Sequence, residues 1–254
     1  MSGGATRAEV CVAACADVCA GVGEALVSPF GTVAVLGARL ARRTTNPDLV
    51  LSDGEAALMV GAPPLSTPPD QLVREAALPY RGVFDVVWSG RRLVMMMASQ
   101  IDRFGNQNLS AIGDWRQPKA QLIGCRGAPG NSTNHPTSYW VPDHNPRTFV
   151  AAVDTVCGVG YDRAAAAGPA ATRYHHLVAV VTNLGVFDFD SPDHAMRVAS
   201  LHDGVGLDQV VEATGFELVV EEPVPVTRTP TDEELTLLRE VLDPANLRDK
   251  EVRP

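Results

Sequence analysis

The residues best suited to chemistry lie in a glycine-rich loop, Gly124-Cys125-Arg126-Gly127-Ala128-Pro129-Gly130. Its glycines, Gly124, Gly127 and Gly130, let the backbone approach a ligand and present N–H groups to negative charge. Arg126 stands among them, and a guanidinium there is suited to clamping a carboxylate or stabilising an oxyanion. No Gly-Lys-Ser/Thr follows, so the loop is not of the Walker A type. A plain tight turn with a solvated arginine explains the loop equally well.

Two further polar clusters follow apolar runs that read as strands. Gln100, Asn106 and Asn108 come after the methionine-rich run 92–97, and polar residues at a strand end often build the site of open α/β folds. The alternative is a turn whose Asn and Asp side chains bond their own backbone. Ser52-Asp53-Gly54-Glu55 ends the run 49–51 and offers a hydroxyl and two carboxylates. Acids at a turn are usually only solvated.

Metal binding is not expected. Cys11, Cys15 and Cys19 lie on one face of the first expected helix, but no nearby histidine completes a tetrahedral set. Such a face is typical of a packed core. His175 and His176 are adjacent in an expected strand and point to opposite faces, so they cannot share a metal or substrate. The GxSxG and HExxH motifs are absent, which leaves serine hydrolases and zinc proteases without support.

Helix and strand signals alternate along the chain, which favours the α/β class. Capping boxes at Thr6–Glu9 and Thr231–Glu234 predict helices that reach about Ala20 and Leu242. We also expect helices ending near 42–43 and over 206–214, strands at 26–27, 49–51, 84–88, 92–97 and 174–182, and an irregular but ordered stretch over 99–146. No domain boundary is visible, so a single domain over 1–254 is expected.

Composition excludes several classes of function. The chain has 254 residues, 45% of them apolar, enough for a substantial core. Its formal net charge of −9 disfavours nucleic acid as a partner. No apolar stretch is long enough to span a membrane, and we expect no secretory signal. An odd count of 5 cysteines without a CxxC pair predicts reduced thiols and a cytoplasmic location.

Taken in order, these segments resemble the β subunit of class I CoA transferases, such as those acting on glutaconate or 3-oxo acids. The family signature is present as Gln100-Ile101-Asp102 and Gly105-Asn106-Gln107-Asn108, and Val180–Phe187, Leu201–Val205 and Thr214–Phe216 also match. The resemblance spans nearly the whole chain. It implies an open, mostly parallel sheet with flanking helices and a homologous α subunit in an αβ or α2β2 assembly. It also implies an acyl-CoA site at the subunit interface, with acyl-CoA as substrate and no cofactor.

The departures from the family concern its chemistry. Class I transferases carry a nucleophilic glutamate in a turn where this chain has Ser52 or Asp53, depending on the alignment. Aspartate is one methylene shorter, and a misplacement of about 1 Å can cost about a hundredfold in rate. The glycine-rich loop has also gained Arg126 and Pro129. These changes fit a narrower resemblance, to the β subunit of the CoA-transferase-like ring-opening hydrolases of actinobacterial steroid degradation.

Three functions follow from these resemblances. The first is a half-enzyme that hydrolyses a C–C bond of a cyclic keto acyl-CoA in steroid (cholesterol) ring degradation, with Arg126 stabilising the developing charge and the principal acid/base on the α subunit. In this hypothesis Asp53 belongs to the site without a covalent role. The second is a CoA transferase that uses Asp53 or Glu55 as acyl carrier. The third is a noncatalytic subunit that shapes the CoA site. We expect substrate contacts from Ser52, Gln100, Asn106, Asn108, Gly124, Gly127 and Gly130.

Overall fold

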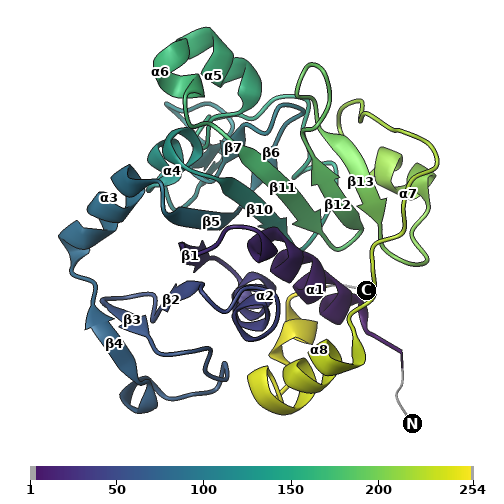
Figure 1. The fold of residues 1–254 in the computed structure, drawn as a ribbon. Coiled ribbons are helices and arrows are strands. Elements are labelled where there is room, and N and C mark those ends of the chain that lie inside the picture. Colours follow the sequence, from purple (N-terminus) through teal and green to yellow (C-terminus); the bar gives the residue numbers. More distant parts are fainter. Residues whose placement is uncertain (1–3, 253–254) are drawn as a thin grey trace. The chain divides into compact units, whose positions relative to one another are not determined.

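A computed structural model describes residues 4–252, and the chain divides into two units. The first comprises Met1–Met95 and Thr227–Pro254, and the second Met96–Val226. Figure 1 shows the elements of both units in sequence colours. The single domain expected over the whole chain stays a prediction, and each unit is described by itself.

The first unit is built on parallel strands flanked by antiparallel ones. Strand β1 (Leu26–Pro29) pairs in parallel with β2 (Val50–Ser52) and with β5 (Arg92–Met97), whose last two residues belong to the second unit. Strands β3 (Ala57–Met59) and β4 (Arg74–Ala77) continue the sheet beyond β2 as antiparallel neighbours. The carboxyl ends of β1 and β2 therefore lie together at one edge of the sheet, where parallel sheets commonly place their sites.

Helices α1 (Arg7–Ala20) and α2 (Thr32–Arg43) pack against each other (Figure 1). The close approach depends on small residues, because a Cβ at Gly37 would lie 2.5 Å from the Cβ of Cys15. Cys11, Cys15 and Cys19 are all at most 1% exposed, which confirms that this helix face belongs to the core. Burial raises the pKa of Cys11 and of Cys19 to about 12, so both are neutral thiols.

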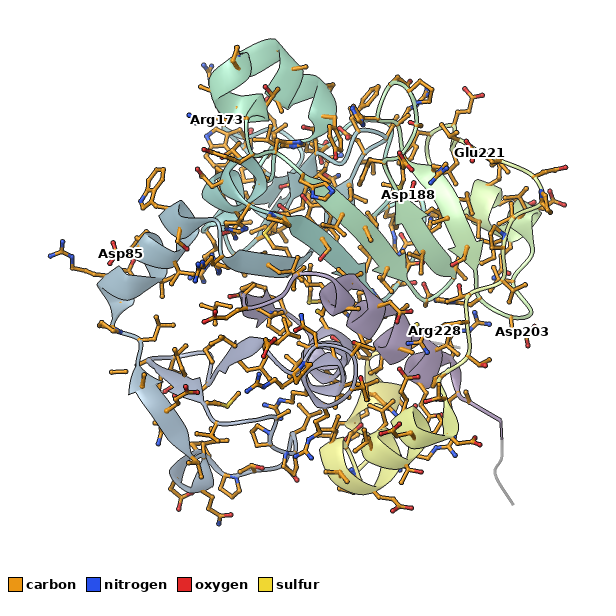
Figure 2. All side chains as sticks on the ribbon, viewed as in Figure 1. Asp85, Arg173, Asp188, Asp203, Glu221 and Arg228 are labelled. Carbon is orange, nitrogen blue, oxygen red and sulfur yellow. The ribbon has the colours of Figure 1, made fainter. Side chains whose placement is uncertain are left out.

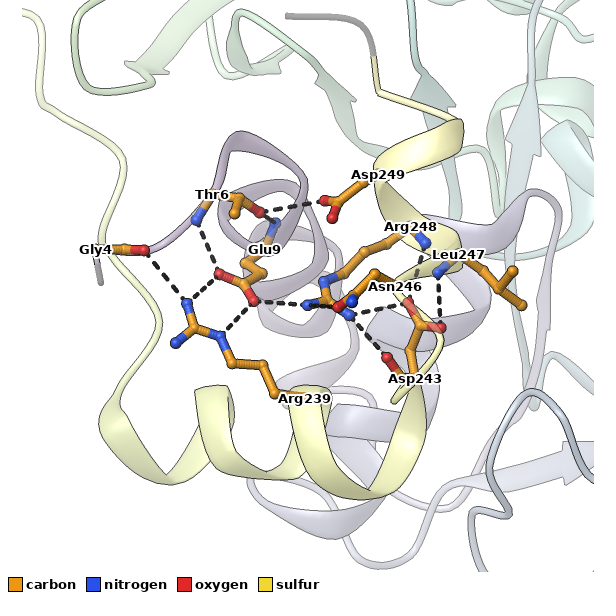
Figure 3. Close-up of polar contacts among 9 residues, drawn as sticks. All are labelled: Gly4, Thr6, Glu9, Arg239, Asp243, Asn246, Leu247, Arg248 and Asp249. Carbon is orange, nitrogen blue, oxygen red and sulfur yellow. Dashed lines mark hydrogen bonds and ion pairs between the residues drawn. The ribbon is translucent and has the colours of Figure 1, made fainter. Parts of the chain in front are cut away.

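The C-terminal segment of the first unit begins at the second capping box. Thr231 caps α8 (Asp232–Thr236), which continues in π-helical geometry over Leu237–Leu242 and is followed by a 3₁₀ turn, Leu247–Lys250. The side chain of Glu9, inside α1, is fully buried and accepts hydrogen bonds from Arg239 and Arg248 of this segment (Figure 3). These contacts attach the C-terminal segment to the start of the chain.

The second unit has a mixed sheet with one parallel pair. Strands β10 (Thr137–Val141) and β11 (Leu177–Thr182) are parallel, and β12 (Gly185–Asp188) and β13 (Arg197–Leu201) follow as antiparallel neighbours. Arg197 donates hydrogen bonds to Asp188 at 2.8 and 2.9 Å and to Glu221 at 2.8 Å, the two acids being labelled in Figure 2. These bonds join the edge of the sheet to the segment that follows helix α7 (Leu207–Glu212).

Short elements surround this sheet. Two small ribbons are formed by β6 (Gln100–Ile101) with β7 (Gln107–Asn108) and by β8 (Ala111–Ile112) with β9 (Ala120–Gln121). The helices of this unit are α4 (Ala128–Asn134), α5 (Tyr161–Ala167), α6 (Pro169–Thr172) and α7 (Leu207–Glu212). The stretch expected to be irregular is thus ordered, although β10 within it was not foreseen.

The strand predicted at 84–88 is wrong, because these residues belong to helix α3 (Tyr80–Ser89). Pro79 stands at its N-cap and Gly90 ends it in a left-handed conformation with φ 71°. The valines and aromatic residues of this segment favour a strand locally. Its large aromatic side chains nevertheless recur every fourth residue, as Tyr80, Phe84 and Trp88, which is a helical spacing. All three are exposed, by 79, 51 and 76%.

The predicted α/β class with flanking helices is confirmed. Parallel pairing is confined to β1 with its two neighbours and to β10 with β11 among the pairs described, and the outer strands make the sheets mixed. Within residues 4–252, no helix is both long enough and apolar enough to cross a membrane.

Candidate functional site

The turn at the end of β2 borders a cavity of about 290 Å³ in the first unit. Gly54 makes the turn possible, since its φ of 82° is a left-handed conformation that glycine adopts without strain. Apolar side chains of β1, β2, β3, α2 and the start of α3 form most of the walls. The polar lining residues are Ser28, Arg39, Ser52, Asp53, Glu55 and Arg92.

Within this turn, Asp53 is committed to the backbone. Its Oδ1 accepts N–H bonds from Glu55, Ala56 and Ala57 at 2.9–3.0 Å, and its Oδ2 faces Arg74 Nε at 3.4 Å. Burial alone would raise the pKa of this carboxyl, but these hydrogen bonds outweigh it and lower the pKa below its ordinary value. A carboxylate held in this way organises the turn and is poorly placed to act as a nucleophile.

Ser52 and Glu55 are less constrained. The Ser52 Oγ accepts one weak bond, from the N–H of Gly54 at 3.3 Å, and the residue lines the cavity. Glu55 is exposed and also lines it. The predicted substrate contact from Ser52 is therefore compatible with the geometry and stays a prediction.

In the second unit, the signature residues bind one another. Gln100 Oε1 accepts from Asn108 Nδ2 at 2.7 Å and from the N–H of Asp154 at 2.9 Å, and its Nε2 donates to the Asp154 carboxylate at 2.9 Å. The Nδ2 of Asn106 donates to Asp102 and Asp162, and its Oδ1 accepts the N–H of Gly160. These buried amides hold together loops that are distant in the chain, whereas the alternative expected for this cluster was a turn bonded to its own backbone. Their role as substrate ligands stays a prediction.

The same signature borders a second, more open cavity. It has a volume of about 550 Å³ and includes Gln100 among its lining residues, with Asn145, Arg147 and Thr148 on the facing loop. Asn106 and Asn108 do not line it. The side-chain oxygen and nitrogen of Gln100 are already hydrogen-bonded in the network above.

The glycine-rich loop presents Arg126 to solvent. Gly124 has φ 85°, and Arg126 itself has φ 52°, a left-handed conformation uncommon for a residue with a side chain. Gly127 precedes α4, whose first residues include Pro129 and Gly130. The neighbouring Cys125 Sγ lies 2.9 Å from Cys157 Sγ, which holds the loop against a buried segment. Backbone strain of this kind, kept by its surroundings, is a common feature of functional sites.

The structure adds two residues that the sequence reasoning missed. Ser28 lies near the end of β1, as Ser52 ends β2, and this strand-end position could have indicated it. Arg92 opens β5 and gave no signal, because only the tertiary structure brings its side chain to Ser28, with Nε and Oγ 3.0 Å apart. Asp53 belongs to the first unit and Arg126 to the second.

Metal ligands are not grouped anywhere in the described part of the chain. Among residues 4–252, no set of three His, Cys, Asp or Glu side chains is arranged to hold an ion. All 5 cysteines are free. His175 and His176 precede β11, where His175 Nε2 lies 2.8 Å from the carbonyl oxygen of Val159.

Comparisons with known proteins identify the family and several relatives of this chain. A family model described as Coenzyme A transferase matches residues 81–213. The chain is 56% identical over 247 residues to the cholesterol ring-cleaving hydrolase IpdB subunit of Rhodococcus jostii (strain RHA1), covering 97% of this chain and 96% of the relative. The crystal structure of R. jostii RHA1 IpdAB superposes with a TM-score of 0.94 at 55% identity, covering 98% of this chain and 99% of the other. The decarboxylase AibA/AibB superposes with a TM-score of 0.82 at 25% identity, over 97% and 98% of the two chains.

Proposed function

Because the chain belongs to the coenzyme A transferase family, we propose that it is the β subunit of a heteromeric hydrolase that opens a steroid-derived ring. Its substrate is a cyclic keto acyl-CoA from cholesterol degradation, and its partner is a homologous α subunit. Water adds to the ring ketone and the adjacent C–C bond breaks. The bonding electron pair is left as an enolate that takes up a proton, while the former ketone carbon becomes a carboxylate.

The observation that carries this proposal is the state of the turn that bears the nucleophile in the transferases. Asp53 is occupied by three backbone N–H groups and faces Arg74, and Ser52 offers only a hydroxyl. A transferase needs a carboxylate free to carry acyl and CoA groups in turn. Ring hydrolysis needs instead a stabiliser of negative charge and a base, and the exposed Arg126 is suited to the first role. The base is proposed to lie on the α subunit.

The proposed function also implies a partner subunit and a cellular compartment. Relatives of this chain are named as subunits of two-component proteins. The exposed aromatic side chains Tyr80, Phe84 and Trp88 fit a chain that works in an assembly, since such patches commonly mark interaction sites. We further propose an α2β2 assembly, a cytoplasmic location, and no cofactor or metal. Exhaustive chelation of the assembled enzyme should therefore leave turnover intact.

Kinetics on the co-expressed complex test the function, with a cyclic keto acyl-CoA as substrate and folding checked separately. Arg126→Ala should lower kcat/KM by about 10²–10³-fold, as for removal of one oxyanion donor. Arg126→Lys keeps the charge without the planar fork and should lose less. Asp53→Asn and Glu55→Gln should cost less than Arg126→Ala. Arg163→Ala, which removes an exposed arginine of α5, is the matched control.

The alternatives predict different outcomes. Loss of activity in Asp53→Asn or Glu55→Gln with a nearly silent Arg126→Ala would establish the CoA transferase. A thioester on a carboxylate of this chain, trapped with borohydride, would do the same. Full turnover in all three variants would leave the chain as a noncatalytic subunit.

A further inference from the structure

Two cysteines of the second unit bring their sulfur atoms together at the glycine-rich loop. Cys125 lies in the loop and Cys157 in the segment before α5, 32 residues further along the chain, and their Sγ atoms are 2.9 Å apart. Both are free thiols. A disulfide has an S–S distance of about 2.05 Å, so the two sulfur atoms are roughly 0.9 Å from bonding distance. A small movement of the loop therefore suffices to join them.

The two thiols differ in their access to solvent. Of the 5 cysteines, four are buried and Cys125 is partly exposed, whereas Cys157 is 1% exposed. Burial and the hydrogen bond from Cys125 raise the pKa of the Cys157 thiol, which makes it the poorer target for a dissolved oxidant. Redox-sensing cysteines are typically solvent-accessible and lie next to a resolving cysteine. Cys125 and Cys157 have these two positions.

The backbone around the pair is firm on one side and strained on the other. The N–H of Cys157 donates to the carbonyl oxygen of Gln107 at 2.8 Å, and Gly158 exchanges two backbone hydrogen bonds with Gln107, each of 3.0 Å. Cys125 directly precedes Arg126, whose φ of 52° is a left-handed conformation. A covalent bond between the sulfur atoms would therefore tie the strained loop to a segment that is anchored on β7.

We propose that Cys125 and Cys157 form a reversible disulfide that switches the glycine-rich loop in response to hydrogen peroxide. Peroxide oxidises the Cys125 thiol to a sulfenic acid and releases one water. The Cys157 sulfur then attacks the Cys125 sulfur, the S–O bond breaks, and the hydroxyl leaves with the Cys157 proton as a second water. The peroxide has taken up two electrons, and a dithiol reductant restores both thiols by exchange. The proposed cytoplasmic location fits, because disulfides there are usually transient and catalytic or redox-sensing.

The disulfide should lower turnover through Arg126. This consequence rests on the proposed function, in which Arg126 stabilises the developing charge. Closing the gap between the sulfur atoms displaces the loop by up to roughly 0.9 Å at the residue next to Arg126. Since a misplacement of about 1 Å can cost about a hundredfold in rate, we expect the oxidised complex to lose about 10- to 100-fold in kcat/KM. Dithiothreitol should restore it.

The test maps the thiols of the assembled complex independently of turnover. The reduced complex is exposed to hydrogen peroxide, denatured in iodoacetamide, digested and analysed by mass spectrometry. The number of alkylated cysteines in this chain should fall by two from the 5 of the reduced chain, and the Cys125 and Cys157 peptides should be joined. Hydrogen exchange of the backbone amides over residues 122–128 should be slower in the cross-linked chain.

Two variants separate the steps. Cys157→Ser should leave a sulfenic acid on Cys125, which dimedone traps. Cys125→Ser should form no cross-link and should keep the kcat/KM of its own reduced form through the same exposure to peroxide. Cys19→Ala is the matched control, because Cys19 is a buried cysteine of α1, 1% exposed, and its loss should leave the cross-link unchanged.

The outcomes for the switch and for the proposed function are distinct. Retention of all 5 alkylated cysteines after peroxide, or a cross-link of Cys157 that persists in Cys125→Ser, would overturn the inference. So would full turnover of the cross-linked complex when Arg126→Ala is damaging. A silent Arg126→Ala in the reduced complex would count against the proposed function alone. Slower amide exchange in the cross-linked loop would then still support the switch, and unchanged exchange would overturn it.

Discussion

Replacing Glu9 by glutamine should destabilise the first unit, because Glu9 joins the two ends of the chain. Its side chain is fully buried, and its oxygens accept from Arg239 Nε and Nη2 and from Arg248 Nη2, each at 2.8 Å (Figure 3). The same carboxylate completes the capping box by accepting the N–H of Thr6 at 2.9 Å. Glutamine keeps the shape but removes the charge and turns one acceptor into a donor that faces arginine.

The magnitude can be worked from the pKa of this carboxyl. Burial by itself would raise it, but hydrogen bonds from Arg239 and Thr6 and the nearby charges of Arg248 and Arg239 lower the pKa from 4.5 to about 2. A shift of that size corresponds to roughly 3 kcal/mol. Arg239 is one-third exposed, so solvent screening reduces the value, and we expect a loss of about 2–3 kcal/mol in the free energy of unfolding.

The pH dependence has a definite sign. Because the folded-state pKa lies below the unfolded one, the stabilisation is present above about pH 4.5 and is lost as the pH falls toward about 2. Thermal unfolding of the assembled complex at pH 7 should show a midpoint lowered by roughly 4–12 °C in Glu9→Gln. The difference from the unmodified protein should shrink as the pH is lowered through this window.

Glu24→Gln is the control, since the Glu24 side chain is 73% exposed and lies 4.0 Å from Arg91. An exposed pair of this kind should contribute less than about 1 kcal/mol. The reasoning is refuted if Glu9→Gln destabilises no more than Glu24→Gln at pH 7, or if its effect does not change with pH.

Two further predictions concern the second unit. A Cβ at Gly160 would lie 2.5 Å from the carbonyl oxygen of Phe104 and from the N of Asn106, so Gly160→Ala should lower the unfolding midpoint by several degrees, whereas Gly21→Ala, with open space around it, should not. Burial lowers the pKa of His144 to about 3. Between about pH 6.5 and pH 3 the unfolded state therefore binds one more proton than the folded state, and the free energy of unfolding decreases as the pH is lowered. His144→Gln should therefore reduce the slope of unfolding free energy in this window by about 1.4 kcal/mol per pH unit, and an unchanged slope would count against a neutral buried His144.

Local interactions are what the sequence by itself determined. The capping boxes at Thr6 and Thr231 join residues three apart in the chain, so their side chains meet as soon as the first helical turn forms. The cysteine face of α1 was likewise readable, because helical spacing places Cys11 and Cys15 on one side whatever the rest of the chain does. The α/β class followed from the alternation of such signals. In α3 the local propensity of the valines and aromatic residues favoured a strand, whereas the spacing of the aromatic side chains favoured a helix. The structure has the helix, so the prediction from propensity was wrong.

The site depended on contacts between distant parts of the chain. Gln100 meets Asp154, 54 residues away, and this pairing engages the side-chain amide of Gln100. Arg92 reaches Ser28 across 64 residues because β1 and β5 lie parallel in one register. Sequence reasoning could nominate Ser52 and Asp53 from their place at a strand end, but only the folded turn showed that three backbone N–H groups occupy Asp53. A polar side chain becomes a site residue or a structural one according to the partners that strand pairing brings within hydrogen-bonding distance, and those partners are set by the tertiary structure.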